Sequence, residues 1–346
     1  MRATFVYPNT RRELLAGIRD GDEPDSTLHG ALHLAGHGID VRFHDPLLTR
    51  RPLPAGLTRL AWNARELSTP FEIGRTDVVF TPLAAWLPLA ARVRVLPVVV
   101  INFGLNLMWR RASRARRTLL RASLRSAARV VCLGESQRAE LVAEAALDSE
   151  RVLSLPIPVD DVFFVPPAEP PETRGVIAVG KDLSRDYATF VAAIERLDVE
   201  STIIAHPRNL ESIDVPPSVR VLGGIPFREL RDRYAGAACV VVPQRDDGYP
   251  YGSEGGGITT LLEAMAMARP VVASRRAIFA DYVDDGVDAL LVPPEDPAAL
   301  ADAVGRVLAD PELADSLGRA ARARVERLHT SRRFAARLAP VLRSVL

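Results

Sequence analysis

Two groups of residues in the second half of the sequence have the types and spacing needed to bind a polar, anionic ligand. The first lies in the run Glu254-Gly-Gly-Gly-Ile-Thr-Thr-Leu-Leu-Glu263-Ala-Met-Ala-Met-Ala268. Glu263 is its one charged side chain after the glycines, and a carboxylate in so apolar a helix is costly unless something pairs with it. Two sugar hydroxyls would suit it, and the glycines would let N–H groups at the helix start approach an anion. The alternative is an ordinary surface glutamate.

The second group is basic and follows an apolar run at residues 175–179. In Gly180-Lys181-Asp-Leu-Ser-Arg185 two cations stand four positions apart. Such a pair after a strand suits a diphosphate, which arginine binds with its fork and lysine as a point charge. Lys181 is the one lysine among 44 basic residues. The alternative is a pair of solvated loop cations.

The elements that position these residues read as alternating strands and helices. In the first half, strands are predicted at 3–7, 39–43, 77–80, 97–101 and 129–133, and helices at 26–36 and 110–128. The pattern restarts with strands at 175–179, 201–205, 219–222, 238–242, 271–273 and 289–292. Valine-rich strands separated by helices indicate a parallel α/β sheet in each half.

The stretch from Val165 to Arg174 carries four prolines and little apolar content, which favours a domain boundary. We therefore predict an N-terminal domain at 1–166, a linker at 167–174 and a second domain at 175–330. The remaining residues, 331–346, are predicted to form a helix that packs back on the first domain. Phe334, Leu338 and Leu342 recur there at helical spacing and need a surface to cover.

Composition narrows the classes of function. The net charge is +1 and charged residues make up 25%, so no bulk field favours nucleic acid. Cys132 and Cys239 lie in apolar runs without metal-type spacing and read as core thiols in a reducing cytoplasm. With no signal-peptide pattern and no long apolar run, we expect a cytoplasmic protein.

The second half resembles the nucleotide-sugar-dependent glycosyltransferases of the GT-B fold, in particular family four. The resemblance rests on the Leu-Glu-Ala-Met-Ala helix, the following Pro-Val-Val strand and the segments 223–238, 287–303 and 310–318. It covers about residues 130–335 well and the first 130 only in rhythm. It implies an α/β GT-B architecture of two doubly wound Rossmann-like domains facing across a cleft, with the second domain binding the sugar donor.

The resemblance also assigns donor-site residues. Glu263 matches the second of the family's paired glutamates and is expected to bind the donor ribose. The first glutamate maps onto Gly255, so Glu254, displaced by one position, is either its substitute or a plain loop carboxylate. Lys181 matches the first diphosphate-binding cation, and Arg185 stands one residue early for the second. Backbone groups complete the site: the amides of Gly257, Ile258 and Thr259 at the sugar and phosphates, and Ile225 at the base.

The sequence indicates fewer candidate residues for binding the acceptor than for binding the donor. Many family members have a histidine after the strand equivalent to 98–101, where this chain has Asn102. His29, near the start of a predicted helix, is a second weak acceptor-side candidate. His29, His33 and His37 also recur at metal-like spacing. However, His37-Gly38 closes the predicted helix and no further ligand is local, so no metal is predicted.

The resemblance implies transfer of a hexose-type sugar to a hydroxyl acceptor with retention of configuration. It implies no metal and no cofactor besides the nucleoside diphosphate sugar as co-substrate. We expect the acceptor to be a small molecule, a glycan or a lipid-linked molecule, and the chain to be a monomer or homodimer. Two alternatives stay open: a nucleotide-sugar epimerase on the same fold, and a catalytically silent nucleotide-sugar-binding partner protein.

Residues Arg110–Arg129 include eight arginines and no acid. With leucines and Trp109 interleaved, this segment has the composition of a basic amphipathic helix lying on an anionic bilayer. That interpretation predicts peripheral membrane contact. The alternative is an arginine-rich outer helix of the first sheet.

Overall fold

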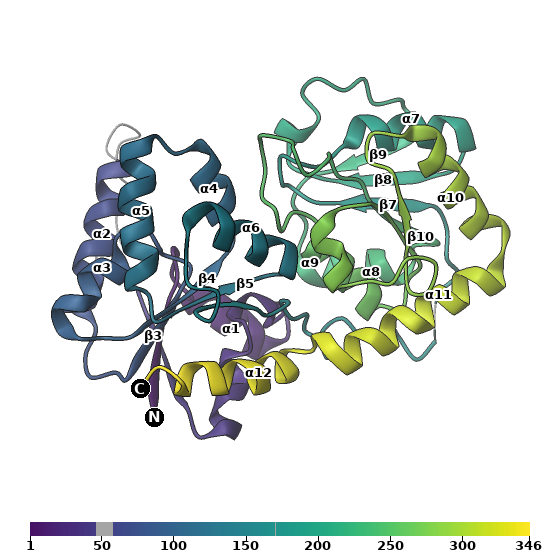
Figure 1. The fold of residues 1–346 in the computed structure, drawn as a ribbon. Coiled ribbons are helices and arrows are strands. Elements are labelled where there is room, and N and C mark those ends of the chain that lie inside the picture. Colours follow the sequence, from purple (N-terminus) through teal and green to yellow (C-terminus); the bar gives the residue numbers. More distant parts are fainter. Residues whose placement is uncertain (46–57, 170) are drawn as a thin grey trace. The chain divides into compact units, whose positions relative to one another are not determined.

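The computed structural model describes residues 1–45, 58–169 and 171–346 (Figure 1). The chain forms two compact units. Unit 1 comprises Met1–Arg19, Leu28–Ile157 and Arg332–Leu346, and unit 2 comprises Asp20–Thr27 and Pro158–Ser331. The proline-rich stretch predicted as a linker therefore falls within unit 2, and the short segment 20–27 also belongs to that unit.

Unit 1 is built on a parallel six-stranded sheet in the order β2-β1-β3-β4-β5-β6. Its valine-rich strands are buried, as expected for a sheet covered on both faces. The strands are β1 (Arg2–Val6), β2 (Asp40–His44), β3 (Val78–Thr81), β4 (Val98–Asn102), β5 (Arg129–Cys132) and β6 (Val152–Ser154). The α-helices are α1 (Arg12–Asp20), α2 (Thr58–Glu72), α3 (Leu87–Ala91), α4 (Leu105–Arg111), α5 (Arg114–Ser126), α6 (Glu135–Ala145) and α12 (Ser331–Arg343).

Unit 2 repeats the plan with a second parallel sheet, in the order β12-β11-β10-β7-β8-β9. Its strands are β7 (Val176–Val179), β8 (Ser201–Ile204), β9 (Val219–Leu222), β10 (Cys239–Val242), β11 (Val271–Ser274) and β12 (Leu290–Val292). Its α-helices are α7 (Tyr187–Leu197), α8 (Phe227–Ala235), α9 (Ile258–Ala266), α10 (Pro297–Ala309) and α11 (Pro311–Arg324). The prediction of two α/β sheets is confirmed.

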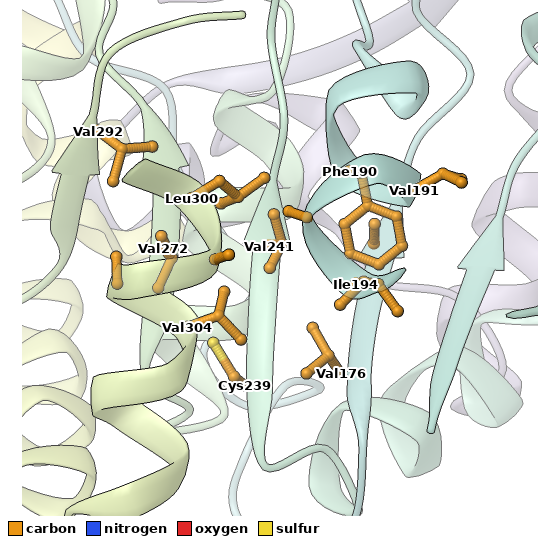
Figure 2. Packing of buried hydrophobic residues seen from close by; sticks show 14 of the residues in the cluster. Val176, Phe190, Val191, Ile194, Cys239, Val241, Val272, Val292, Leu300 and Val304 are labelled. Atoms are coloured by element: carbon orange, nitrogen blue, oxygen red, sulfur yellow. The ribbon is translucent and has the colours of Figure 1, made fainter. Parts of the chain in front are cut away.

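The core of unit 2 explains why these segments form the elements they do. Figure 2 shows Phe190 and Ile194 of α7 and Leu300 and Val304 of α10 lying against valines of the central strands. Each pair stands four positions apart, so both side chains share one face of their helix. The buried strands supply the opposing surface, which is the usual reason a parallel sheet carries helices.

Two predicted helices differ in the structure. Residues 26–36 form two short 3-10 helices, Ser26–Leu28 and Ala31–His37, because His29 and Gly30 between them have positive φ. The predicted helix at 110–128 is broken, since Ala112 is extended and Ser113 begins α5 as its N-cap by accepting from Arg116 N. A serine at a helix start is a common capping signal.

The C-terminal helix α12 belongs to unit 1. Phe334, Leu338 and Leu342 are buried, as their helical spacing requires. Phe334 lies near the ring of His29, with 6.3 Å between ring centroids. Arg343 near the end of α12 donates to the carbonyl of His37.

Candidate functional site

The carboxyl ends of β7 and β10 meet at the switch point of the second sheet. The chain runs from β7 outward through β8 to β9 and then returns to place β10 on the other side of β7. Ligands of open α/β sheets bind outside the strand ends at such a point. The loop after β7 carries Lys181 and Arg185, and the loop after β10 leads into α9. A backbone bridge between Arg185 and Gln244 joins the two loops. The basic group and the helix-start group therefore lie at one sheet edge.

The start of α9 requires the glycine that precedes it. Gly257 is the N-cap with φ of +93°, and a Cβ there would lie 2.8 Å from the Gln244 side chain and 3.0 Å from Phe279. Ile258 N–H donates to Gly255 O at 3.3 Å. Within the described residues, the amides of Gly257 and Thr259 have no acceptor. Two of the three predicted backbone groups are thus available to an anion at the positive end of the helix.

Glu263 is buried one turn along α9. Its carboxylate accepts a hydrogen bond of 3.0 Å from the hydroxyl of Tyr234 on α8. Burial raises the pKa of Glu263 to about 8, although the Tyr234 hydrogen bond and the charge of Arg185 act in the other direction. A buried acid with such a raised pKa is a feature of functional sites.

Arg185 is buried behind the loop after β7. Its Nη2 donates to Thr260 Oγ1 at 2.7 Å, and its Nη1 donates at 2.9 Å to the Gln244 amide in the orientation that satisfies both ends of that amide. A Cβ at Gly180, whose φ is +146°, would lie 2.1 Å from Arg185 Nε. Burial lowers the pKa of Arg185, while Tyr187, Tyr234, Asp182 and Glu263 favour its charged form. Its guanidinium therefore ties β7 to α9 and places a positive charge near Glu263.

Lys181 has an exposed side chain. Its carbonyl accepts from Arg208 Nη2 at 3.1 Å, which fixes the backbone of the loop while leaving the ammonium group at the surface. Glu254 is instead buried in the glycine-rich loop. Ile225 is half-buried in the loop between β9 and α8, also at the carboxyl edge of the sheet.

Asp182 is a site residue that the sequence did not indicate. Its carboxylate accepts from Ser184 N at 2.9 Å and from Ser253 N at 3.2 Å, which joins the loop after β7 to the glycine-rich loop. A signal was available, because an aspartate two residues before a serine often accepts from that backbone in a turn. The contact to Ser253 spans 71 positions and could not be read from spacing.

In unit 1, His29 lies beside the switch point between β1 and β3. Its Nδ1 is 2.9 Å from the hydroxyl of Tyr7, the residue that follows β1. Burial lowers the pKa of His29 to about 3, and the charge of Arg11 acts in the same direction. At neutral pH the ring is therefore uncharged and a poor proton acceptor. The non-glycine φ of +51° at His29 is uncommon.

Asn102 is fully buried at the end of β4. Its Oδ1 accepts from the backbone of Gly104 and Leu105 at 3.1 and 2.7 Å, and its Nδ2 donates to Asn106 Oδ1 at 2.9 Å. These contacts begin α4 and occupy both ends of the amide. The structure thus gives Asn102 a local role in the turn.

The arginine-rich segment also makes internal contacts. Arg117 Nε donates to Trp109 O at 3.0 Å, and Arg121 Nε donates to Ala145 O at 2.9 Å at the end of α6. These bonds place cations at helix C-termini, where they are favourable. Of the helices in the described ranges, none combines the length and the apolar character needed to cross a bilayer.

A cavity of about 560 Å³ opens at the amino ends of β7, β8 and β9, the edge of the second sheet opposite to the candidate site. Arginines and acids both line it, and the C-terminal end of α8 faces it, so we assign it no ligand. Among the side chains that the structure describes, no cluster of three or more His, Cys, Asp or Glu is arranged to hold a metal ion.

Residues 177–310 match the family model described as Glycosyl transferases group 1. A D-inositol 3-phosphate glycosyltransferase of Kineococcus radiotolerans is 27% identical over 240 residues, which cover 57% of this chain and 53% of that protein. A GDP-mannose-dependent alpha-(1-6)-phosphatidylinositol monomannoside mannosyltransferase of Mycolicibacterium smegmatis is 37% identical over 115 residues, 33% of this chain and 30% of that protein. The chain thus spans about half the length, or less, of these relatives.

Solved structures share the whole fold. Sucrose-phosphate synthase from Thermosynechococcus elongatus superposes with a TM-score of 0.74 at 18% identity, covering 100% of this chain and 99% of that chain. HepE from Anabaena, solved in complex with UDP and glucose, has a TM-score of 0.69 at 14% identity. The match covers 99% of this chain and 100% of that chain. At these identities the likeness establishes the fold. Residues 177–310 therefore match the model for Glycosyl transferases group 1, and the chain has the GT-B fold that its sequence resembles.

Proposed function

We propose that the chain is a glycosyltransferase that takes a sugar from a nucleoside diphosphate sugar bound to unit 2. One observation carries this proposal. A buried carboxylate, a helix start with two available amides and an exposed lysine all lie at the switch point of one sheet. The buried carboxylate suits the hydroxyls of a ribose, and the helix-start amides and the lysine suit a diphosphate.

The donor is assigned group by group. The ribose hydroxyls pair with Glu263, and the diphosphate lies against Lys181 and the amides of Gly257 and Thr259. The base lies on the loop between β9 and α8, with the backbone of Ile225 as its partner. Arg185 acts from behind Gly180, where its charge adds to the positive potential while its hydrogen bonds hold the α9 start in place.

In the proposed reaction, the bond between the sugar carbon and the diphosphate oxygen breaks and its electron pair leaves with the diphosphate. The acceptor hydroxyl forms the new bond on the same face, with retention, and its proton passes to the departing phosphate. Fixed cations and amides aimed at the growing negative charge are the main catalytic means available to these residues. Because they need no metal, a chelator is expected to leave the rate unchanged.

The acceptor is proposed to be a hydroxyl on a small molecule, a glycan or a lipid-linked molecule. The matched relatives are named for inositol phosphate and phosphatidylinositol mannoside acceptors, so both soluble and lipid-linked forms belong in a screen. Peripheral membrane contact through the Arg110–Arg129 segment is proposed only together with a lipid-linked acceptor. Co-sedimentation with anionic vesicles would test it.

A panel of nucleoside diphosphates and their sugars, scored by thermal shift, tests the proposed function first. A ligand of the native state raises the melting temperature. The nucleotide sugar that gives the largest shift is then incubated with the protein without acceptor, and the slow release of nucleoside diphosphate is measured. Release of the free sugar supports a transferase, and recovery of an isomerised nucleotide sugar supports the epimerase. Binding without any turnover supports the silent partner protein, and no shift with any nucleotide removes all three.

The raised pKa of Glu263 predicts a pH dependence of nucleotide affinity. Without ligand, the buried carboxyl stays protonated below about pH 8, while ribose hydroxyls pair with its charged form. Below about pH 8, nucleotide binding must therefore release the proton of the Glu263 carboxyl, which costs free energy. Above about pH 8 the carboxyl is already charged and this cost is absent. We expect the affinity for UDP to rise about tenfold from pH 7 to pH 8.5, since one pH unit corresponds to a factor of ten.

Calorimetric titration in two buffers of different ionisation enthalpy measures that proton release directly. The matched control is Glu263→Gln, which has no titrating carboxyl and should show a flat profile over the same range. A wild-type affinity that is constant from pH 7 to pH 8.5, or that falls, would contradict the assignment of the ribose to Glu263.

A further inference from the structure

The side chain of Asp182 holds the glycine-rich stretch before α9 against the loop after β7. The Asp182 carboxylate accepts from Ser184 N at 2.9 Å and from Ser184 Oγ at 2.5 Å on its own loop. Across the gap it accepts from Ser253 N at 3.2 Å and from Ser253 Oγ at 3.3 Å. We call this set of contacts the Asp182 latch.

Two glycines allow the loops to approach this closely. A Cβ at Gly252 would lie 2.4 Å from Asp182 Oδ1 and 2.6 Å from Ser184 N. A Cβ at Gly256 would lie 2.7 Å from Ser184 Oγ and 2.9 Å from Asp182 Oδ1. Real Cβ atoms do not approach other atoms so closely, so an alanine at either position would separate the loops.

The loop that carries Asp182 is itself held in place. Asn209 Nδ2 donates to Asp182 O at 2.8 Å, and the Ser184 hydroxyl lies 2.6 Å from the side-chain amide of Gln244. Asp182 is therefore a fixed point against which the glycine-rich loop is docked. The two loops come from different strands and are also joined near their starts, where Arg245 N donates to Ser184 O at 2.8 Å. The Asp182 contacts are the ones that reach Ser253 in the glycine-rich stretch.

We propose that Asp182 is a positioning residue that aligns the two halves of the diphosphate site. This inference rests on the proposed function, in which Lys181 and the α9 amides must meet the same diphosphate. Lys181 is adjacent to Asp182, and the α9 amides follow the loop that the latch holds. Without the latch, a ligand would have to order the glycine-rich loop on binding and lose affinity accordingly.

The test uses the full chain and the Asp182→Asn variant, with UDP as the probe. An asparagine keeps only one of the two oxygen acceptors, so its NH2 group would face the backbone N–H of either Ser184 or Ser253, and the negative charge is lost. We expect faster hydrogen exchange of amides 252–258 in the free protein and a UDP dissociation constant raised about tenfold or more. The matched control is Asp246→Asn, which removes the same charge from an exposed position on the loop after β10. It should leave both measurements unchanged.

Gly256→Ala provides an independent route to the same state, since it separates the loops without removing a charge. If both changes act by releasing the loop, the double variant should bind UDP no more weakly than the worse single variant. Gly248→Ala is the control, because its Cβ would lie at an ordinary 3.4 Å from Asp246 Oδ1. All variants are compared well below their melting temperatures, so that global destabilisation does not enter.

The inference is overturned if Asp182→Asn binds UDP like the wild type, if exchange at 252–258 is unchanged, or if the two single effects simply add. Failure of the proposed function gives a different result. The wild type would then bind neither UDP nor any other nucleotide of the panel, while exchange at 252–258 would still show whether Asp182 holds the loop.

Discussion

Replacing Lys181 with alanine is expected to lower kcat by about a hundred- to a thousandfold. Negative charge grows on the diphosphate as the glycosidic bond breaks, so a cation placed there stabilises the transition state more than the bound donor. Its ammonium group is exposed at the switch point while its backbone is fixed by Arg208. Single-turnover release of nucleoside diphosphate measures the effect without requiring the acceptor.

The control for Lys181→Ala is Arg220→Ala. Arg220 is an exposed cation of the same domain, but it lines the cavity at the opposite edge of the sheet. Its removal changes the net charge equally and should leave kcat within twofold. Equal losses in the two variants would mean that Lys181 acts only through the general field of the domain.

Replacing Glu263 with glutamine is expected to weaken donor binding by about ten- to a hundredfold when measured at pH 8.5. Hydrogen bonds to a charged group contribute roughly 1.5–3 kcal/mol, and the ribose makes them equally in the ground and transition states. The Michaelis constant should therefore rise much more than kcat falls. The carboxylate is buried, so little water is available to replace the lost contact.

Tyr234→Phe tests how much the hydrogen bond from Tyr234 contributes to the role of the Glu263 carboxylate. It removes the hydroxyl that donates to Glu263 and keeps the ring, which packs in the core. We expect a smaller loss of affinity than for Glu263→Gln. If Glu263→Gln lowers kcat and leaves the dissociation constant unchanged, Glu263 acts on the reacting sugar and the ribose lies elsewhere.

Eleven of the twelve strands in the described ranges could be predicted, most of them because buried parallel strands are nearly continuous valine runs with clear ends. The strand that was not predicted, β6, has only three residues. The two helix errors arose where apolar spacing continued through a backbone break. His29 and Gly30 interrupt one predicted helix with positive φ, and Ser113 restarts another as an N-cap. A left-handed backbone conformation at a histidine depends on tertiary contacts, so no periodic pattern in the sequence indicates it.

Part of the candidate site could also be predicted, because some of its features are local in the sequence. Glycines before a helix and a lone acid within it are local features, so the α9 start and Glu263 stood out. The buried position of Arg185 depends on Gly180, Thr260 and Gln244, which are up to 75 positions away. The hydrogen bonds by which Asn102 begins α4 were not predicted, although its position two residues before a glycine at a strand end was a usable sign.

The most direct test of the central claim is a crystal structure of the chain soaked with the nucleotide that gives the largest thermal shift. We expect the ribose hydroxyls within hydrogen-bond distance of the Glu263 carboxylate and the diphosphate between Lys181 and the amides of Gly257 and Thr259. The base should lie against the backbone of Ile225. A nucleotide bound at the carboxyl edge of the first sheet, or a ribose that does not contact Glu263, would contradict the assignment of unit 2 as the donor domain.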